Sequence, residues 1–565
     1  MTKRRVYLLA LIVLVGPLFY TLPISKLPVS VQQHYYNVFG ERAYREPPAG
    51  ISNVVAPLSI DEICSPELAA WRAAHDIEGV QITAVADCMP DNPWDIAVAV
   101  KGANNVSPAT LMKSLYALDT VEKSDDRDGD GDPDLIRIRL EVMELNGKSP
   151  DVPGPVPRFE IAPGITPGLW VFAPKSRGMT TANFETADAN RLIRLPAPVI
   201  RVEQGDEVEI TLENSHYLPH TIHFHGVDHP FTTPQGAGND GVPTFSEHPT
   251  MPGKAHTYWL RPRHAGTSFY HCHVQPHSHI LMGLQGMFVV EENRPGNWLQ
   301  TFNVGAGRVR AASVAVREDY QREYDLHYLE LDADLNNRIQ DFTDPRLISR
   351  SIHRDYDIVE RRPEYYVLNG RSFPYTLRES LIVSGAGENN LLRVLNGGNE
   401  SLALHFHGHK PILTHRDGVE LGAEFSEQRD VFSIASAQRI DLNLSTVNDG
   451  RDAYGAGAWL LHDHREQAVT SNGIGPGGGV SLVVYEDYLD EHGLPQTVGG
   501  LQSLAAFFSP DYYAGKLPVF AGMGPHHFTD VAQATWLQRH RSVLFGLCLL
   551  IWMLLLRAFL RSRRV

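Results

Sequence analysis

The chain has 565 residues, 43% hydrophobic and 21% charged, an ordinary globular composition that excludes collagen, coiled-coil and wholly disordered proteins. Its 50 Lys and Arg against 66 Asp and Glu give a formal net charge of −16, so it lacks the basic character expected of a nucleic-acid-binding protein. With 26 His and only 4 Cys, the composition excludes a disulfide scaffold and favours imidazole chemistry.

Two apolar runs near the ends of the chain predict membrane anchorage. The first, Val6–Ile24, follows three basic residues and is long enough to cross a bilayer at about 1.5 Å per residue. A cleaved signal peptide is the alternative, but bulky residues stand where a cleavage site needs small ones. The second run, Val543–Leu556, is short and reaches membrane length if the flanking arginines extend to the lipid headgroups.

Basic residues flank the outer end of both runs, which predicts cytoplasmic termini. Residues 1–25 and 536–565 are therefore assigned to transmembrane anchors in contact with membrane lipid. The intervening chain is expected on the periplasmic side of a bacterial inner, or intracytoplasmic, membrane. Cys64 and Cys88 can pair with each other in such an oxidising compartment.

Residues 26–152 are predicted to form a small α+β domain, with a helix over Ser107–Leu118 and a strand over Leu135–Leu145. Between them lies an alternating acidic run that resembles a calcium loop, formed by Asp126, Asp128, Asp130, Asp132 and Asp134. Arg137 stands at the twelfth position, where an EF-hand needs Glu. A structural calcium site and a solvated acidic loop therefore stay open as alternatives.

Short alternating strands with Gly, Pro and Asn turns follow in two stretches, which predicts two β-sandwich domains. The first is assigned to residues 153–300 and the second to residues 355–490. Residues 301–354 are assigned to a linker and residues 491–535 to a C-terminal extension. The predicted fold class is therefore mainly β, with an internal duplication, because each sandwich holds one pair of histidine-rich motifs.

Four His-X-His motifs carry the candidate chemistry. The two in the first sandwich are His223-Phe-His225 and His271-Cys-His273, and the two in the second are His405-Phe-His407 and His462-Asp-His464. Residues i and i+2 of a strand point to the same face, so each motif presents two imidazoles side by side. Together the four motifs offer eight candidate metal ligands.

Strand parity predicts a second site behind the first. Cys272 lies between the two histidines of its motif and points to the opposite face, and His220 stands at an odd offset from His223. His277 and Met282 follow along the chain and can complete this group. Two His, one Cys thiolate and a weak axial Met are the ligands of a blue-copper electron-transfer site.

These motifs resemble those of the multicopper oxidases, the laccase-like family built from cupredoxin domains, over roughly residues 195–490. The resemblance implies one type 1 (blue) copper, held by the Cys272 group, and a three-copper cluster that reduces dioxygen to water. His223 and His405 match the type 2 ligands of the family. The remaining six match the type 3 ligands: His225, His271, His273, His407, His462 and His464.

The second sandwich departs from the blue-copper pattern, because Asp463 and Leu402 replace the cysteine and the leading histidine. Only the first sandwich is therefore expected to hold a type 1 copper. Two-domain members of the family form homotrimers with clusters between subunits, and the resemblance implies the same here. It also points to Asp240 and Glu466 as proton-relaying carboxylates, with a turn Asp and a surface Glu as the alternative.

The predicted function is a membrane-anchored oxidase that takes single electrons from an external reductant, which the sequence does not identify, and passes them to dioxygen. One alternative is a trimeric copper nitrite reductase, which needs fewer histidines than this chain supplies. The other is a copper-sequestering or electron-transfer protein, which does not require such an ordered set of ligands.

Overall fold

A computed structural model describes most of the chain outside the N-terminal 120 residues. The described residues are 3–15, 18, 75–77, 80–82, 120–148, 156, 158–175, 193–295, 299, 301–303, 320–490, 493–496, 504, 506–514 and 540–561. The chain divides into two compact units, one made of residues 1–56 with 520–565 and the other of residues 57–519. The predicted Ser107–Leu118 helix and the proposed Cys64–Cys88 pair lie outside the described residues.

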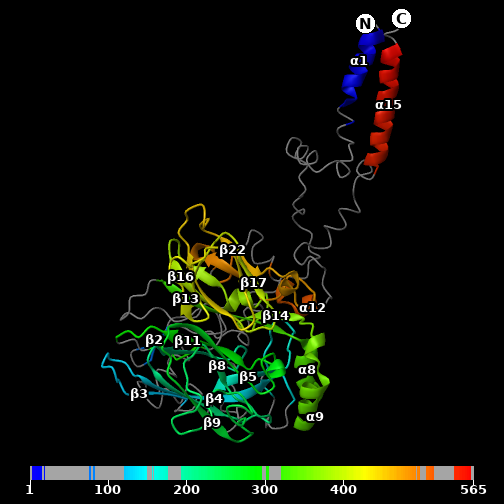
Figure 1. Cartoon of the computed structure of the whole chain (residues 1–565). Helices are drawn as coiled ribbons and strands as arrows, with labels where there is room; N and C mark the ends of the chain where they lie inside the picture. The colour runs from blue at the N-terminus through cyan, green and yellow to red at the C-terminus, as the bar shows by residue number, and fades with distance from the viewer. Residues whose placement is uncertain are drawn as a thin grey trace. The chain divides into compact units, whose positions relative to one another are not determined.

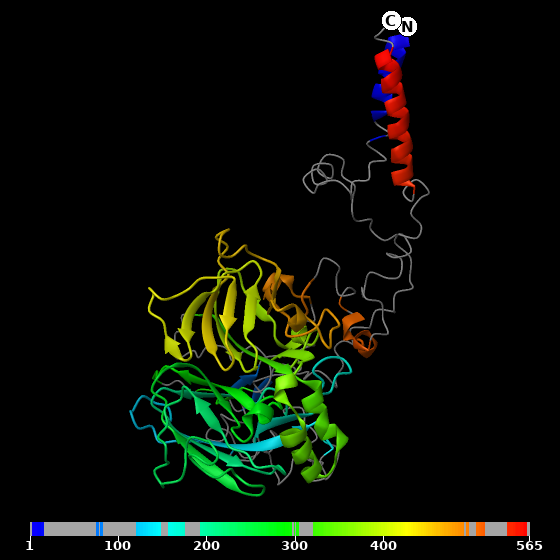
Figure 2. The same cartoon turned by 45° about the vertical axis from the view of Figure 1, so that its right-hand side comes forward.

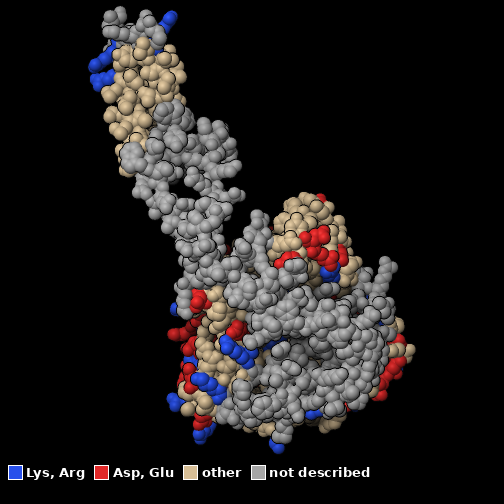
Figure 3. Space-filling view, turned by 180° about the vertical axis from the view of Figure 1, so that it is seen from behind, with Lys and Arg blue, Asp and Glu red and all other residues tan. Residues whose placement is uncertain are grey.

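The first unit contains two terminal helices that lie side by side, α1 (Lys3–Val13) and α15 (Arg541–Arg561) (Figures 1 and 2). Within the described residues, one segment, Val543–Arg561, is long and apolar enough to cross a membrane. On the face shown in Figure 3, the described part of the pair is free of charged side chains along its length and carries Lys and Arg at one end. Much of the first predicted span, Val6–Ile24, lies outside the described residues.

The second unit begins with a short antiparallel pair, β1 (His75–Ile77) and β2 (Val80–Ile82), and continues into a first β-sandwich. One sheet of this sandwich contains β3 (Val121–Ser124), β4 (Leu135–Leu145), β5 (Leu169–Pro174), β7 (Glu207–Glu213) and β9 (Ala255–Leu260). The other contains β6 (Val199–Glu203), β8 (His223–His225), β10 (Gly266–His271), β11 (Gln285–Glu291) and β12 (Phe302–Asn303).

The two sheets of the first sandwich enclose one apolar core. Strand β7 shows how the sequence produces it, because Val208, Ile210 and Leu212 are buried while the intervening residues are half-exposed, as the alternation predicted. Apolar residues of the facing sheet, such as Phe288, complete the core. Cys272 is buried in this same core, directly after β10.

A second sandwich follows with the same plan. One sheet contains β13 (Arg322–Leu331), β14 (Tyr365–Leu368), β16 (Asn389–Asn396), β18 (Ile412–Arg416), β19 (Val419–Glu420) and β21 (Arg439–Ser445). The other contains β15 (Ile382–Ser384), β17 (Leu402–Phe406), β20 (Val431–Ile434), β22 (Ala458–Asp463) and β23 (Ser481–Tyr485). Figure 1 shows this sandwich stacked on the first within the second unit.

The two sandwiches repeat one pairing pattern. In the first sandwich, β4 pairs in parallel with β7, and β7 pairs antiparallel with β9. In the second, β13 pairs in parallel with β16, and β16 pairs antiparallel with β21. Parallel β6–β11 followed by β10 and β8 corresponds to parallel β15–β23 followed by β22 and β17. This agreement supports the internal duplication expected from the motifs.

The predicted domain boundaries need two corrections. Strands β3 and β4 precede residue 153 and were expected in a separate α+β domain, yet β4 pairs with β7 of the first sandwich. Strand β13 lies in the predicted linker, residues 301–354, yet pairs with β14 and β16 of the second sandwich. Both errors have one cause: the first strands of each sandwich carry no histidine motif to mark them.

The stretch of residues 333–360, at and just beyond the end of the predicted linker, is largely helical and packs against the first sandwich. It comprises α8 (Ala333–Asp341), α9 (Pro345–Arg350), the π-helical turn η4 (Ser351–Asp355) and η5 (Ile358–Glu360). Asp332 and Asp344 cap α8 and α9 by accepting hydrogen bonds from backbone N–H groups. Apolar residues of three of these elements, including Leu335, Ile348 and Ile352, join the core of the first sandwich.

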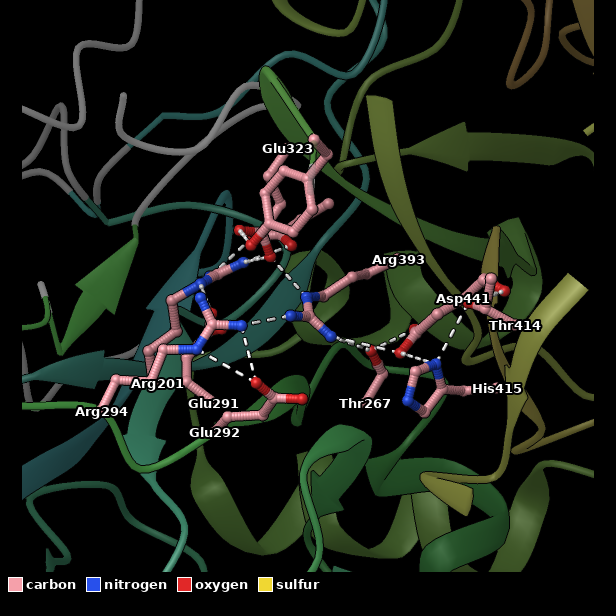
Figure 4. Close-up of polar contacts among 12 residues, drawn as sticks. Arg201, Thr267, Glu291, Glu292, Arg294, Glu323, Arg393, Thr414, His415 and Asp441 are labelled. Carbon is pink, nitrogen blue, oxygen red and sulfur yellow. Dashed lines mark hydrogen bonds and ion pairs between the residues drawn. The ribbon is translucent and has the colours of Figure 1, made fainter. Parts of the chain in front are cut away.

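A buried ionic network joins the two sandwiches (Figure 4). Arg201 of β6 donates to Asp325 at 2.6 and 2.9 Å and to Glu323 at 3.0 Å, and both carboxylates belong to β13. Burial raises the pKa of Glu323, but the guanidinium groups of Arg393 and Arg201 outweigh it and lower that pKa to about 2. Arg393 also reaches Asp441 of β21 at 3.2 Å. These buried, paired charges fix how one sandwich sits on the other.

Candidate copper sites

The four His-X-His motifs form two separate histidine groups, one in each sandwich. The first quartet consists of His223, His225, His271 and His273. Strands β8 and β10 pair in register with His271 opposite His223, which places their side chains on one face. The ring centroid of His223 lies 5.0 Å from that of His225 and 5.4 Å from those of His271 and His273.

The second quartet, His405, His407, His462 and His464, repeats this geometry on β17 and β22. His462 lies opposite His405 in the strand register. The ring of His405 lies 4.7 Å from that of His407 and 5.4 Å from that of His464. Among the described residues, the ring contacts between motif histidines run within each quartet. Each quartet is thus half of the predicted eight-histidine set.

Backbone carbonyls fix the proton position on four of these rings. The Nδ1 atoms of His223 and His405 lie 2.6 and 3.0 Å from the carbonyl oxygens of Asp240 and Asp430. The Nδ1 atoms of His271 and His462 lie 2.9 Å from the carbonyl oxygens of the residues that follow them. A carbonyl can only accept, so each Nδ1 carries the proton and each Nε2 offers a lone pair to a metal.

Burial favours the neutral form that metals bind at His223, His225 and His271, because it lowers the pKa of each of these three rings. It lowers the pKa of His271 to about 3, and, with the neighbouring His223 ring, that of His225 to about 4. The Nε2 atoms of His225 and His271 face each other at 2.9 Å. Such a pair of converging lone pairs suits one bound cation between them. The second quartet is more open, and the side chain of His464 is 56% exposed.

The predicted second site forms on the other side of β10. The sulfur of Cys272 lies 3.6 Å from Nδ1 of His220 and 3.4 Å from Nδ1 of His279, and all three side chains are buried. Burial raises the pKa of the Cys272 thiol to about 12, so its thiolate needs a cation to form at neutral pH. Two histidines and one cysteine at this spacing fit the donor set of a type 1 copper.

The structure corrects one predicted ligand, because His279 and not His277 lies beside Cys272. After Gln275, which has a φ of 46°, the chain enters the short helix α7 (Pro276–His279), where strand parity no longer applies. This turn buries His279 completely and leaves His277 half-buried. Pro276 at the start of the helix was the sequence signal for the break. Met282 is buried in the same core and stays a predicted axial ligand.

The two predicted carboxylates lie beside the two quartets. Oδ1 of Asp240 is 3.4 Å from Nδ1 of His223 and 3.2 Å from Nε2 of His229. Oε1 of Glu466 is 3.9 Å from Nδ1 of His464, and the Glu466 side chain is 87% exposed. Asp240 is therefore held in a polar cluster, whereas Glu466 stands at the open edge of the second quartet.

The acidic loop brings together three of its five carboxylates. Asp126, Asp128 and Asp134 place oxygens within 4.8 Å of one another, while Asp130 and Asp132 lie outside this group. The backbone N–H groups of Gly129 and Gly131 donate to Asp126 at 2.7 and 3.1 Å. The loop is thus compact, and its three oxygens are the donor type that calcium prefers.

Comparison with known proteins finds a family similarity for the part of the chain that carries the first quartet. Residues 189–295 match the family model described as multicopper oxidase. This part of the chain is therefore similar to the multicopper oxidases. The match runs from β6 to β11 and includes the Cys272 group, while the second sandwich lies outside it.

Curated relatives agree with the family match over short segments. Laccase 1 of Metarhizium acridum is 30% identical over 109 residues, which is 19% of this chain and 17% of that protein. A multicopper oxidase of Cercospora beticola is 32% identical over 124 residues, 21% of this chain and 19% of the relative. A copper-containing nitrite reductase of Neisseria meningitidis serogroup A is 36% identical over 100 residues, 17% of this chain and 23% of the relative. The chain thus matches less than a quarter of each relative's length.

Among solved structures, a blue copper oxidase from Nitrosomonas europaea shows a TM-score of 0.45 at 23% identity, covering 68% of this chain and 94% of that chain. A multicopper oxidase designated mgLAC shows the same TM-score at 22% identity, covering 62% of this chain and 86% of that chain.

Proposed function

We propose that the protein is an oxidase that accepts single electrons at a type 1 copper and reduces dioxygen to water at a three-copper cluster. The observation that carries the proposal is the position of Cys272, whose sulfur belongs to one site while its two neighbours, His271 and His273, belong to the first quartet. Copper supplies one-electron redox chemistry and dioxygen binding when it is present. The chain supplies the ligands and the short covalent path between them.

The eight motif histidines are assigned to the cluster by their geometry and by the family resemblance. His223 and His405 take the type 2 role by the family resemblance, and they are equivalent in position, since each Nδ1 contacts the backbone carbonyl of an aspartate. The type 3 role falls to His225, His271, His273, His407, His462 and His464. The type 1 role falls to His220, Cys272 and His279, with Met282 as the axial candidate.

Proton supply is assigned to the two neighbouring carboxylates. Reduction of dioxygen to water consumes protons, and a relay must hold them within hydrogen-bonding reach of the cluster. Asp240 contacts both His223 and His229, so it can receive a proton from one side and release it on the other. Glu466, at the solvent edge of the second quartet, can take up protons from water.

We further propose that the working form is a homotrimer. Each quartet supplies only half of a cluster, and the exposed His464 side chain leaves the second quartet open to a partner. A ring of three subunits brings the first quartet of each subunit against the second quartet of the next, as heterologous contacts in a closed ring require.

The protein is proposed to be anchored in a bacterial inner or intracytoplasmic membrane. The apolar length of Val543–Arg561 and the basic residues at one end of the helix pair support this arrangement. The sandwiches then lie on the periplasmic side with both termini in the cytoplasm, and an electron donor near the membrane becomes accessible.

A calcium ion in the acidic loop is a separate proposal, supported by the convergence of Asp126, Asp128 and Asp134. Calorimetric titration of the purified protein with calcium, repeated on Asp134→Asn, tests it, since a true site loses affinity in the variant. Identical heats in both proteins would assign the loop to a solvated acidic turn.

Metal content and spectra of the detergent-purified protein test the main proposal. We expect about four copper ions per chain, a blue thiolate absorption band and an EPR-silent coupled pair. Oxygen uptake with ferrocyanide as the donor should be lost in Cys272→Ser and retained in His264→Gln, an exposed control two residues before β10. Full turnover by Cys272→Ser would reject the assignment.

A nitrite reductase is the second candidate, favoured by a stretch of 100 residues that is 36% identical to such an enzyme. Such an enzyme needs only three histidines at a single interfacial copper, and the two quartets together present eight. Nitric oxide production from nitrite, with about two EPR-visible copper ions per chain and no oxygen uptake, would favour this candidate.

A further inference from the structure

Two histidines outside the quartets contact the outer nitrogens of the candidate type 1 ligands. Nδ1 of His216 lies 2.9 Å from Nε2 of His220, and Nε2 of His353 lies 2.9 Å from Nε2 of His279. The four rings therefore form a chain that passes through the Cys272 site from one side to the other. The inference drawn from this chain rests on the type 1 copper proposed above.

The proton positions along the first half of the chain follow from its neighbours. His220 turns Nδ1 toward the Cys272 sulfur, so this nitrogen must be unprotonated to bind a metal. Its single proton then sits on Nε2 and is donated to Nδ1 of His216. The backbone N–H of Leu218 also points at this Nδ1, at 3.4 Å, which agrees with Nδ1 of His216 being an acceptor.

The same reasoning fixes the second half. His279 turns Nδ1 toward the sulfur at 3.4 Å, so its proton sits on Nε2 and is donated to Nε2 of His353. His353 then carries its own proton on Nδ1, which lies 3.3 Å from the hydroxyl oxygen of Ser349. Both outer histidines are hydrogen-bond acceptors toward a copper ligand, an arrangement that orients the ligand and raises its basicity.

The two ends of the chain differ in their access to solvent. His216 is only 6% exposed and is covered by the Tyr217 ring at 3.9 Å and by the edge-on Trp170 ring at 5.1 Å. His353 is half-buried. It belongs to η4, whose residue Ile352 is fully buried in the core of the first sandwich and so anchors the ring in place.

We propose that His353 is the surface end of the route by which electrons enter the type 1 copper, and that it positions the ligand His279. With copper bound, His353 and His279 would carry one electron from the external donor to the metal, which would be reduced from the cupric to the cuprous state with no bond formed or broken. Because His353 accepts the Nε2–H of His279, it strengthens that ligand, stabilises the cupric state and lowers the reduction potential of the copper.

The side chains around His353 form the surface that an electron donor must contact. Side chains of both signs stand around η4 and α9, including the exposed Arg346, Arg350 and Asp355. Besides His279, the half-buried His277 is a titratable neighbour of this ring. With the ligand His279 fully buried, a donor must meet His353 and this mixed surface rather than the copper ligand itself.

Two substitutions separate the positioning role from the electron-transfer role. His353→Phe keeps a ring but removes the acceptor, whereas His353→Gln keeps an acceptor but removes the ring. His264→Gln is the control. For each protein we would record copper content, the blue absorption band, the reduction potential and the anaerobic rate of type 1 reduction by hexaammineruthenium(II) in a stopped-flow instrument.

The expected results are distinct for each variant. His353→Phe should keep the blue band and raise the potential, yet slow reduction at least tenfold although the driving force has increased. His353→Gln should bring the potential back toward that of the wild type but still reduce slowly.

An unchanged or faster reduction rate in both His353 variants would overturn the entry route, and an unchanged potential in His353→Phe would overturn the positioning role. A wild-type protein without a blue band would instead overturn the type 1 copper itself, and this inference with it.

Discussion

At the scale of single residues, the geometry rests on a division of labour between the two nitrogens of each imidazole. In four motif rings Nδ1 carries the proton and donates it in a hydrogen bond to a backbone carbonyl, so Nε2 is left for metal binding. At the Cys272 site the pattern reverses, because Nδ1 of His220 and His279 faces the sulfur. One residue type therefore serves two kinds of site through its hydrogen-bond partner alone.

The assignment of His279 gives a direct prediction. His279→Gln should abolish the blue absorption band, because the site loses one of its two nitrogen ligands next to Cys272. His277→Gln is the matched control two residues away on the same short helix, and it should retain the band. Optical and EPR spectra of the copper-loaded variants decide between them. Loss of the band in His277→Gln with retention in His279→Gln would restore the ligand expected from the sequence.

Much of this local geometry was predictable. The His-X-His repeat and the position of Cys272 needed only the two-residue period of a strand, and the register of His271 with His223 agrees with it. His279 was missed because the period ends at α7. His353 was missed because its partner, His279, lies 74 residues away in the sequence. His216 was missed although His220 is only four residues further on, because it lies in an irregular loop where no strand spacing applies.

At the scale of elements, the turn between β6 and β7 holds a buried acid with an altered pKa. Asp206 accepts a hydrogen bond from the backbone N–H of Glu203 at 2.7 Å and is buried. Burial is the largest cause that raises its pKa from 3.8 to about 7, and the nearby Asp134 and Asp132 carboxylates add to the effect. The folded state therefore disfavours the ionised form of this side chain.

This shift predicts how stability changes with pH. Because the folded-state pKa lies above the unfolded value, ionisation of Asp206 lowers the free energy of unfolding. This cost is absent below about pH 4, grows as pH rises, and is complete above about pH 7. Asp206→Asn removes the ionisation, so its advantage over the wild type should widen from pH 4 to pH 8. At about 1.4 kcal/mol per pKa unit, the free energy of unfolding of Asp206→Asn should gain at most roughly 4 kcal/mol over that of the wild type between these pH values.

Urea unfolding of the full-length protein at pH 4, 6 and 8 measures this difference. Glu122→Gln on β3 is the control, because Glu122 is an exposed carboxylate on a neighbouring strand. A gap between Asp206→Asn and the wild type that stays constant with pH would show that Asp206 is already ionised at pH 4 in the folded protein.

The elements also show where sequence periodicity fails. The eleven-residue strand β4 was correctly read as a strand over Leu135–Leu145 but was given to the wrong domain. Its partner β7 lies beyond a long connection, and pairing between distant parallel strands leaves no local signal. The same holds for β13 and β16 in the second sandwich. Strand existence was therefore predictable, whereas strand partners were not.

At the scale of the whole molecule, the duplication explains why one chain carries two histidine quartets but one candidate type 1 site. Both sandwiches place a quartet on the same pair of strands, β8 with β10 and β17 with β22. At the position equivalent to Cys272, the second sandwich has Asp463, which accepts from the guanidinium of Arg465 at 2.6 and 2.8 Å. An ion pair between the buried Asp463 and the half-buried Arg465 thus occupies the place of the thiolate. In the proposed oxidase, electrons therefore enter through the first sandwich.

If the cluster forms between subunits, then two inactive variants should restore activity when they assemble together. His225→Ala damages the first quartet and His462→Ala damages the second, and each homotrimer should lack oxygen uptake. In a mixed trimer, one interface joins the intact first quartet of the His462→Ala subunit to the intact second quartet of a His225→Ala subunit. Cys272 of the His462→Ala subunit is also intact, so the electron path to this interface survives. Such a trimer should show about one third of wild-type activity, because one interface in three is complete.

Co-expression with two different affinity tags, tandem purification and oxygen uptake with ferrocyanide measure this outcome. The control pairs His225→Ala with His271→Ala, since both variants damage the first quartet and no interface can be complete. Restoration in the first pair but not in the control requires that the two halves of a cluster come from different chains. Inactivity of both mixed assemblies, with each variant folded and trimeric, would place both halves in one chain and exclude the intersubunit cluster.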